Sequence, residues 1–350
     1  MALSPLRIAI LGAGMIGRRH IDTVLQRPDL ATLAGVADPV LPPPPGPAGQ
    51  VPWLDDPAEL LDRVRPDAVI IATPNQLHLA HGLLCCERGL PFLVEKPVTA
   101  TWDEAVALVQ AVARAGLPTL VGHHRRYLAP VQTAKQRLSE GAIGELVAAS
   151  VVWATRKPDP YFDVAWRRSA GGGPLLINAI HEVDMLRHLC GEVVQVQGVK
   201  SHARRGFPVE DTAAAILVFA SGCVATLVCT DAGLSPWTIE QGTQENAAFG
   251  FTHESAYRIV GSRGSLELPV LRQWSARTPG HEAWDKPLTS QYLGGGWHDP
   301  YEAQLAHLQR IVRAGEAPRI SVADGARTLA ATLAIGQAAE SGAAVRPPEV

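Results

Sequence analysis

A glycine-spaced turn near the N-terminus constrains the fold more than any other feature. Gly12-Ala13-Gly14-Met15-Ile16-Gly17 follows a β-branched run and precedes an amphipathic stretch. The first glycine permits a tight turn, the second lets a pyrophosphate approach the backbone, and the third lets helix and strand pack closely. Since free N–H groups at a helix start attract anions, we expect Gly12, Gly14, Met15, Ile16 and Gly17 to bind a dinucleotide. The alternative is a glycine-rich turn without a ligand.

Asp38 supports the dinucleotide interpretation. It follows the next expected strand, Leu33–Ala37, where a carboxylate binds ribose hydroxyls in such folds. This position favours NAD over NADP. Asp38-Pro39 could instead be a simple turn, and an arginine from elsewhere could still bind a 2′-phosphate.

The first third of the chain alternates short apolar runs with amphipathic ones, which is typical of βαβ units. A capping box at Thr101 and Glu104 begins the clearest helix, which ends near Gly116. We therefore predict a Rossmann doubly wound parallel sheet. Its expected strands are Arg7–Leu11, Leu33–Ala37, Ala68–Ala72, Phe92–Val94 and Thr119–Val121.

Beyond about residue 121 the pattern changes to β-rich segments that suggest an antiparallel or mixed sheet. Two hairpins are expected, Ala214–Phe219 with Val224–Thr230 and Tyr257–Val260 with Ser265–Leu268. The fold class is thus α/β with a C-terminal α+β domain. Helices are expected at Leu128–Ser139, Leu176–Leu189, Pro300–Ala314 and Val322–Glu340.

These patterns predict two domains. Residues 1–122 form the nucleotide-binding domain and residues 123–342 a domain for substrate binding and oligomerisation, followed by a tail at 343–350. The last helix, about 322–340, could pack back on the first domain. A chain of 350 residues is long enough for two cores.

Composition excludes several classes of protein. The net charge is −3 with 47% apolar residues, so nucleic acid is not an expected partner. The five cysteines are scattered and lack a CxxC pair, which argues against disulfides and a metal cluster. With neither a signal sequence nor a membrane-length apolar run, we expect a cytoplasmic protein.

Polar clusters follow several expected strands. In open parallel sheets ligands bind along the carboxyl edge of the strands, so these clusters are candidates for the cofactor site, although each alone would be an ordinary loop. The clusters are Thr73-Pro74-Asn75-Gln76-Leu77-His78, Glu95-Lys96-Pro97 and His123-His124-Arg125-Arg126-Tyr127.

Lys96 is the first candidate for proton transfer. Pro97 disfavours helical geometry at Lys96, which would hold the lysine extended at the strand end. Beside an oxidised nicotinamide and partly desolvated, its amine could have a lowered pKa and take an alcohol proton during hydride transfer. The alternative is a surface lysine in a turn.

A glycine-rich segment, Gly171-Gly172-Gly173, leads into the second candidate group. Asn178, His181 and Asp184 recur every three residues, so they share one helical face. His181 could exchange the substrate proton and Asp184 could orient its ring. A structural histidine is the alternative. His181-Glu182 begins like HExxH, but Met185 fills the last position, so zinc is disfavoured.

With these motifs in view, the chain resembles the Gfo/Idh/MocA family of oxidoreductases. The resemblance implies a Rossmann domain, an open-faced, mostly antiparallel sheet domain, and a nicotinamide between them. It implies oxidation or reduction of a sugar, polyol or related cyclic alcohol, with Lys96 and His181 catalytic. Further residues match positions near the cofactor or substrate: Arg125, Tyr127, Trp166 and Arg167.

The chain departs from the family pattern at two places. Many polyol dehydrogenases of the family have aspartate four residues before the histidine, where this chain has Ile177, and asparagine where it has His124. We therefore carry two alternatives to the dehydrogenase, an NAD-dependent glycosidase using transient oxidation and elimination, and a non-catalytic NAD-binding regulator. An open sheet face needs covering, so we expect a homodimer or homotetramer through the C-terminal sheet.

Overall fold

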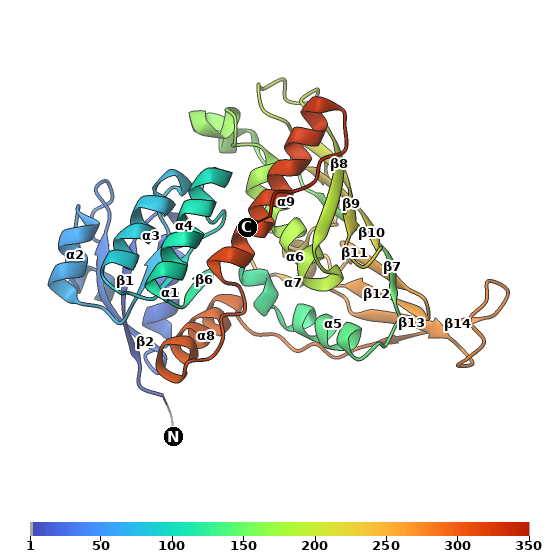
Figure 1. Cartoon of the computed structure of the whole chain (residues 1–350), viewed down its shortest axis with the longest axis horizontal. Helices are drawn as coiled ribbons and strands as arrows, with labels where there is room; N and C mark the ends of the chain where they lie inside the picture. The colour runs from blue at the N-terminus through green and yellow to red at the C-terminus, as the bar shows by residue number, and fades with distance from the viewer. Residues whose placement is uncertain (1–2, 350) are drawn as a thin grey trace. The chain divides into compact units, whose positions relative to one another are not determined.

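The computed structural model describes residues 3–349 and divides into two compact units (Figure 1). The first unit extends to His124 and also contains Asp299–Leu329, while the second comprises Arg125–His298 and Ala330–Glu349. The boundary near residue 122 is close to the predicted one. The assignment of the whole of 123–342 to the second domain is wrong, because residues 299–329 return to the first unit.

The first unit contains a six-stranded sheet in which every pair is parallel. The predicted doubly wound sheet is confirmed, with one further short strand at the β2 edge. In spatial order the strands are β3 (Trp53–Leu54), β2 (Ala31–Ala37), β1 (Leu6–Leu11), β4 (Ala68–Ile71), β5 (Phe92–Val94) and β6 (Thr119–Val121). The helices are α1 (Met15–Gln26), η1 (Pro47–Gln50), α2 (Pro57–Val64), η2 (Asn75–Leu77), α3 (His78–Glu87), α4 (Trp102–Ala115) and α8 (Pro300–Ala314).

Local signals explain how α4 begins and ends. The Thr101 side chain accepts a hydrogen bond from the Glu104 amide, and the Glu104 side chain reaches back to the Thr101 amide. Gly116 adopts a φ of 64° at the C-terminus, a conformation that glycine adopts without strain. The predicted capping box therefore forms.

Helix α8 belongs to the first unit because its apolar face completes the core there. Leu305 and Leu308 lie in the same buried cluster as Ile8, Ile10 and Leu120. The backbone also returns to the sheet edge, where the Val121 amide of β6 donates to the Ile320 carbonyl at 2.9 Å. These are contacts between residues far apart in the sequence.

The second unit contains an eight-stranded sheet that is antiparallel except for the β7–β10 pair. The predicted mostly antiparallel sheet is confirmed. In spatial order its strands are β14 (Leu288–Tyr292), β13 (Arg272–Ala276), β12 (Gly264–Leu268), β11 (Tyr257–Gly261), β7 (Leu146–Ala154), β10 (Val224–Thr230), β9 (Thr212–Phe219) and β8 (Val193–Ser201). The remaining elements are η3 (His124–Tyr127) at the unit boundary, α5 (Ala129–Ser139), η4 (Asp159–Asp163), η5 (Ala165–Arg168), η6 (Leu175–Ala179), α6 (Ile180–Cys190), α7 (Ile239–Thr243) and α9 (Val322–Ser341), which spans the boundary.

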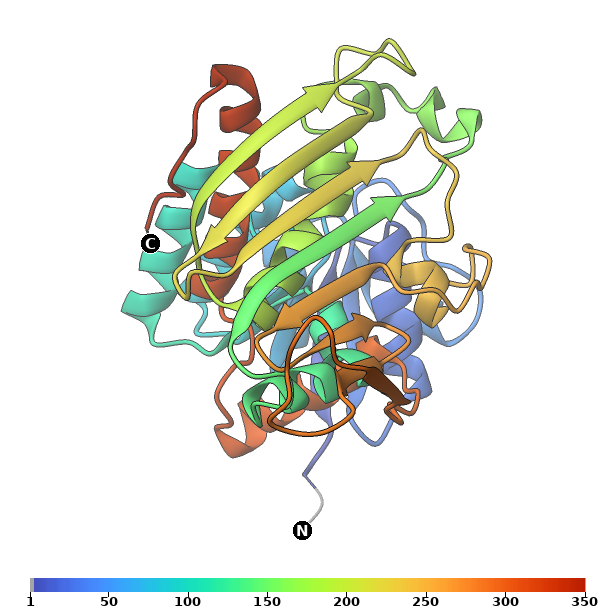
Figure 2. The ribbon, with the colours of Figure 1, turned by 90° about the vertical axis from the view of Figure 1, so that its right-hand side faces the viewer.

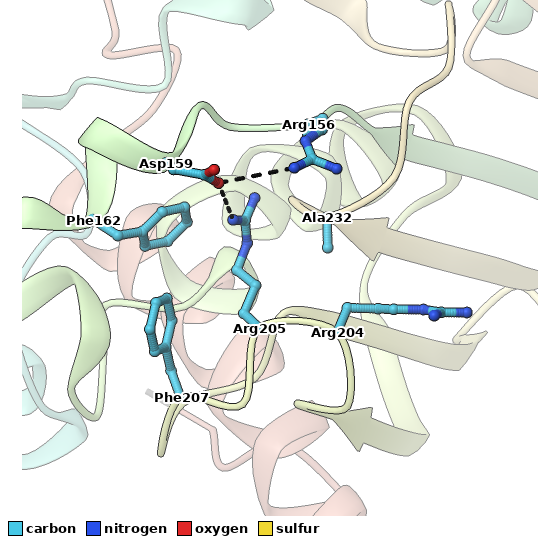
Figure 3. Close-up of a pocket in the computed structure, with 7 residues that line it drawn as sticks. All are labelled: Arg156, Asp159, Phe162, Arg204, Arg205, Phe207 and Ala232. Carbon is cyan, nitrogen blue, oxygen red and sulfur yellow. Dashed lines mark ion pairs between the residues drawn. The ribbon is translucent and has the colours of Figure 1, made fainter.

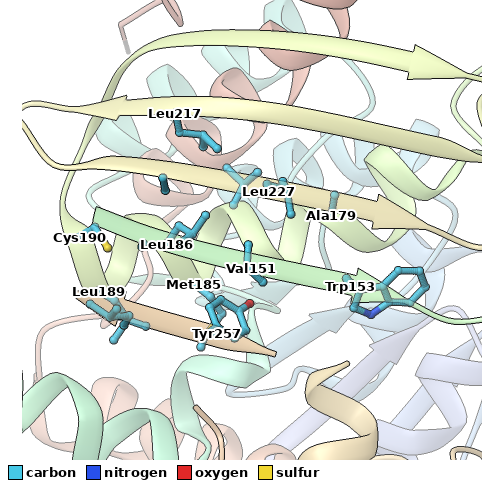
Figure 4. Close-up of a cluster of buried hydrophobic side chains, with 14 of the residues drawn as sticks. Val151, Trp153, Ala179, Met185, Leu186, Leu189, Cys190, Leu217, Leu227 and Tyr257 are labelled. Atoms are coloured by element: carbon cyan, nitrogen blue, oxygen red, sulfur yellow. The ribbon is translucent and has the colours of Figure 1, made fainter. Parts of the chain in front are cut away.

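One face of this sheet packs on α6 and the other is open (Figures 2 and 4). In β10, Leu227 and Cys229 are buried, whereas Thr226 and Val228 point outward. Met185 and Leu186 of α6 join the buried cluster against the covered face. The alternation of side chains along each strand thus produces one dry face and one exposed face.

The helix predicted at Leu176–Leu189 has two parts. Its first turn, η6, has the π pattern, and the regular α-helix α6 begins only at Ile180. Among residues 3–349, none of the helices has the length and apolar character needed to cross a bilayer.

Candidate active site

The glycine turn after β1 is crowded on its inner side and open on its outer side. Gly12 has a φ of 91°, and a Cβ there would lie 2.7 Å from the Ala72 carbonyl oxygen. A Cβ at Gly17 would lie 2.0 Å from the Gly12 carbonyl oxygen, whereas one at Gly14 would meet nothing within 4 Å. Gly14 and the 82%-exposed Met15 therefore border free space.

That free space suits an anion. Helix α1 begins at Met15, and no side chain caps its N-terminus, so its first amides are available to an acceptor. A pyrophosphate can accept these hydrogen bonds only if the backbone is approachable, which the bare Gly14 permits. The turn therefore fits the phosphates of a dinucleotide.

Asp38 connects the end of β2 to the glycine turn. Its Oδ2 accepts from the Ala13 amide at 2.7 Å, and its Oδ1 accepts from the Val40 and Leu41 amides at 2.9 and 2.8 Å. Burial would raise the pKa of Asp38, but these three amides together hold it below its usual value. The ionised carboxylate forms the turn weighed as an alternative and also faces the nucleotide loop, where it would repel a 2′-phosphate.

The loop after β4 is fastened from beneath by His78. Its ring nitrogens lie 2.9 Å from the Thr73 carbonyl oxygen and 2.8 Å from the Pro97 carbonyl oxygen. His78 is 1% exposed, and burial lowers its pKa despite these acceptors. Of the predicted cofactor residues in this loop, Pro74 is exposed while Thr73 and Asn75 are half-buried. We assign His78 to holding the loops together.

Glu95 is buried beneath the predicted catalytic lysine. Its Oε1 lies 2.8 Å from His20 Nε2, and its Oε2 accepts from the Lys96 amide at 3.2 Å. Burial would raise the pKa of Glu95, but the His20 contact and nearby positive groups, Lys96 included, hold it below its usual value. A Cβ at Gly122 would lie 2.6 Å from this carboxyl group, so Gly122 makes room for it.

The backbone amide of Lys96 is therefore bound to a buried carboxylate at the carboxyl edge of the sheet. Its side chain is half-buried, and the Lys96–Pro97 peptide bond is cis. The loops after β1, β2, β4 and β5 all lie at this edge because the strands are parallel. The lowered pKa expected for Lys96 stays a prediction.

Asn178 and Asp184, which are predicted to share a helical face with His181, have different partners in the second unit. The Asn178 Oδ1 accepts from Lys157 Nζ at 2.8 Å. Asp184 accepts from Arg126 Nε and Nη2 at 2.8 and 2.6 Å, which is a bidentate pair. His181 is 7% exposed. Through this pair Asp184 fixes η3 against α6, and its predicted role in orienting His181 stays a prediction.

Arg125, predicted to bind substrate, is instead the centre of a buried ion cluster. Its guanidinium donates to Glu182 at 2.6 Å, to Glu245 at 2.9 Å and to Glu240. Arg125 is 3% exposed and Tyr127 is 2% exposed. Three acidic side chains thus use most of the donors of this guanidinium. Both residues are buried in the second unit, and their contact with substrate stays a prediction.

Trp166 and Arg167 lie in η5. Trp166 is 53% exposed. Arg167 donates to the Tyr161 carbonyl at 2.8 Å and lies 4.1 Å over the Tyr161 ring, an arrangement that fixes its guanidinium. Both remain candidates for ligand contact.

Sequence reasoning missed Lys157, which follows β7. Its Nζ lies 3.4 Å from Asp231 Oδ2 and 4.8 Å from the centre of the Tyr161 ring. Burial lowers the pKa of Lys157, although Asp231 opposes the shift. No local motif marks this lysine, since its partners are distant in the sequence.

Two family models match most of the chain. The model described as "Oxidoreductase family, NAD-binding Rossmann fold" matches residues 6–123, and the "GFO/IDH/MocA C-terminal domain" matches residues 131–267. An inositol 2-dehydrogenase from Mycolicibacterium gilvum (strain PYR-GCK) is 30% identical, covering 82% of this chain and 77% of that one. The chain belongs to the Gfo/Idh/MocA family.

Two further proteins match along nearly the full length of this chain. The scyllo-inositol 2-dehydrogenase (NAD(+)) of Bacillus subtilis (strain 168) is 25% identical, covering 97% of this chain and 96% of that one. An oxidoreductase from Agrobacterium radiobacter, solved in complex with NAD+, L-tartaric acid and magnesium, superposes with a TM-score of 0.80 at 21% identity, covering 97% and 98% of the two chains.

The predicted identity as an NAD-dependent Gfo/Idh/MocA oxidoreductase is thus confirmed. The relatives from Mycolicibacterium gilvum and Bacillus subtilis are both dehydrogenases, which does not favour the glycosidase or the non-catalytic regulator. The substrate and the roles of individual residues are matters of proposal.

Proposed function

We propose that this enzyme oxidises a secondary alcohol on the ring of a sugar or cyclic polyol, or reduces the corresponding ketone. The observation that carries the proposal is Lys96, fixed by the buried Glu95 at the same sheet edge as the glycine turn. The inositol dehydrogenases among the relatives support the substrate class.

The residues divide the work as follows. The turn at Gly12–Gly17 would hold the pyrophosphate and Asp38 the adenosine ribose, with Met15, Ile16, Thr73, Pro74 and Asn75 beside the nucleotide. When bound, NAD supplies the hydride acceptor or donor. Lys96 Nζ would take or return the proton of the reacting hydroxyl, and the His181 imidazole would exchange it. Asn178 would contact the substrate, and Trp166 and Arg167 the cofactor.

Replacement of Lys96 by methionine tests this assignment, because methionine keeps the length of the side chain and removes the amine. Turnover should fall about 10²- to 10⁴-fold, which is typical for loss of a general acid or base. The measurement is NADH absorbance over a panel of inositols, sugars and lactones, with NAD binding followed by calorimetry. Lys286→Met, at an exposed loop, is the control. Unchanged turnover in Lys96→Met would exclude the role.

We also propose a homodimer or homotetramer formed through the open face of the eight-stranded sheet. That face presents Val228, Thr226 and Ile216 on its central strands, and Ile216 and Val228 are 42% and 37% exposed. A flat apolar face of this kind is typical of a subunit interface.

The five free cysteines support a reducing, cytoplasmic location.

A further inference from the structure

A cavity of about 350 Å³ lies at one end of the eight-stranded sheet, entirely within the second unit. Its walls come from the segment after β7, from η4 and from the loop between β8 and β9 (Figure 3). They carry three arginines, two phenylalanines and one carboxylate: Arg156, Arg204, Arg205, Phe162, Phe207 and Asp159. The volume is within the range of small-molecule sites, and the charge of its walls favours an anion.

The central arginine is pre-oriented. Arg205 Nε donates to Asp231 Oδ1 at 2.9 Å, and Nη2 donates to the carbonyl oxygens of Lys157 and Asp231 at 3.0 and 2.5 Å. Its guanidinium also lies 4.1 Å over the Phe162 ring. These contacts occupy one side of the guanidinium and leave Nη1 directed into the cavity. A fixed guanidinium loses little entropy when it binds an anion.

The carboxylate in the cavity is held only loosely. Asp159 Oδ1 lies 3.7 Å from Arg205 Nη1 and 3.9 Å from Arg156 Nη2, and its side chain is 79% exposed. Both distances exceed those of a hydrogen bond, and exposed pairs of this kind contribute little stability. Figure 3 shows dashed lines from Asp159 to the guanidinium groups of Arg205 and Arg156. Two arginines therefore converge on a point that an external carboxylate or phosphate could occupy with better geometry.

The loop that carries the other arginine is also fixed. The Asp211 Oδ2 accepts from the amides of Arg204 and Arg205 at 2.8 and 2.9 Å, and Asp211 is buried. The Arg204 side chain is exposed at the rim. The ring centres of Phe162 and Phe207 lie 5.3 Å apart, forming an apolar wall on which the carbon face of a ring could pack.

The cavity is joined to the segment that carries His181. Arg205 binds Asp231, Asp231 contacts Lys157, and the Lys157 amine donates to Asn178, three residues before His181. The turn before α6 touches the same loop, since the Leu175 amide donates to Glu210 Oε1 at 3.1 Å. The cavity and the start of the His181 helix thus lie at the same end of the sheet.

We propose that this cavity binds the acidic group of the substrate, so that the enzyme prefers a sugar or cyclic polyol bearing a carboxylate or phosphate over its neutral counterpart. The inference rests on the proposed function, which it narrows to acidic substrates. Arg156, Arg204 and Arg205 neutralise the anion, and the two phenylalanines contact the ring.

The proposal is tested by assaying the 350-residue chain, supplied with NAD, on three matched substrates. D-Glucose, D-glucuronate and D-glucose 6-phosphate differ at one carbon, so they compare a neutral, a carboxylate and a phosphate group. The variants are Arg156→Gln and Arg204→Gln, neither of which removes a side-chain hydrogen bond of the described structure. Arg346→Gln, on the exposed segment after α9, is the control.

We expect kcat/KM to favour at least one acid over glucose by about tenfold or more, the scale of one charge-assisted hydrogen bond. Arg156→Gln and Arg204→Gln should each remove most of that preference, chiefly through KM, and leave the neutral sugar unchanged. A wild-type enzyme indifferent to the acids, or variants that slow glucose and the acids equally, would overturn the proposal. The identity of the preferred acid separates carboxylate from phosphate.

Failure of the proposed function would look different. If Lys96→Met and the wild-type enzyme are equally inactive on the whole panel, oxidation of sugars and cyclic polyols is excluded. Calorimetry with glucuronate and glucose 6-phosphate then decides the cavity separately. Binding that Arg156→Gln weakens about tenfold supports the anion site, and no binding to the wild-type protein overturns it.

Discussion

Replacement of Glu182 by glutamine should make the stability of the protein less sensitive to alkaline pH. Glu182 lies in the buried cluster around Arg125, where burial raises its pKa to about 8 despite the contact with Arg125. Its Oε1 accepts from Arg125, while its Oε2 has no hydrogen-bond partner within the described structure. Glutamine therefore reproduces the protonated carboxyl group and keeps the Arg125 contact.

The stability of the protein should fall with rising pH, because the pKa of Glu182 is higher in the folded than in the unfolded state. The unfolded carboxyl group titrates near 4.5 and the folded one near 8, so the folded state holds an extra proton between them. The stabilisation that this extra proton gives the folded state is fully present below pH 4.5 and is lost as the pH rises through about 8. The loss is about 1.4 kcal/mol per pH unit, which gives roughly 3 kcal/mol between pH 6 and pH 8.

The assay is urea unfolding followed by circular dichroism at pH 6, 7, 8 and 9. The difference in unfolding free energy between Glu182→Gln and wild type should grow by a few kcal/mol in favour of the variant up to pH 8, then level off. Glu140→Gln, at a half-exposed ion pair, should show no such trend. Parallel profiles for Glu182→Gln and wild type would refute the assignment of a raised pKa to this carboxyl group.

Two further predictions concern the glycine turn and the open sheet. Gly14→Ala should fold normally but lose most of its NAD affinity, measured by calorimetry, because the added Cβ enters only the space assigned to the pyrophosphate. Gly17→Ala should also unfold at a lower temperature, because its Cβ would lie 2.0 Å from the Gly12 carbonyl oxygen. Normal NAD binding by Gly14→Ala would argue against that placement. Ile216→Arg should dissociate the oligomer, measured by sedimentation, and Val40→Arg, at an exposed position, is the control. An unchanged oligomer in Ile216→Arg would show that the interface is not on this face of the sheet.

Local patterns were sufficient for most strands of the first sheet, for two hairpins of the second and for the nucleotide turn. They did not reveal β3, β7, β8, β13 or β14. The glycine spacing and the Thr101 capping box each depend on residues close together in the chain, and the structure shows both. Two hairpins were found for the same reason, because their turns join neighbouring strands. Asp38 follows β2 as expected, its carboxylate accepts from three backbone amides, and its contact with a ribose stays a prediction. The family resemblance then supplied the open sheet that periodicity alone left as antiparallel or mixed.

Contacts between distant residues account for what was missed. Arg125 meets Glu182, Glu240 and Glu245, which are 57 to 120 positions away, so its motif position could not reveal that it is buried. Asp184 also has a bidentate partner, Arg126, that is 58 positions away, and its place three residues after His181 does not reveal this contact. Helix α8 was recognised as a helix, but its periodicity does not say which core it completes.

The return of residues 299–329 to the first unit has a consequence for biosynthesis. A ribosome makes β1 to β6 first, but Leu305 and Leu308, which seal that core, emerge only after the whole eight-stranded sheet has been translated. The nascent nucleotide-binding unit therefore has uncovered apolar surface while residues 125–298 are added. Such an interval invites chaperone binding, and a chain terminated before residue 299 would remain in that state permanently.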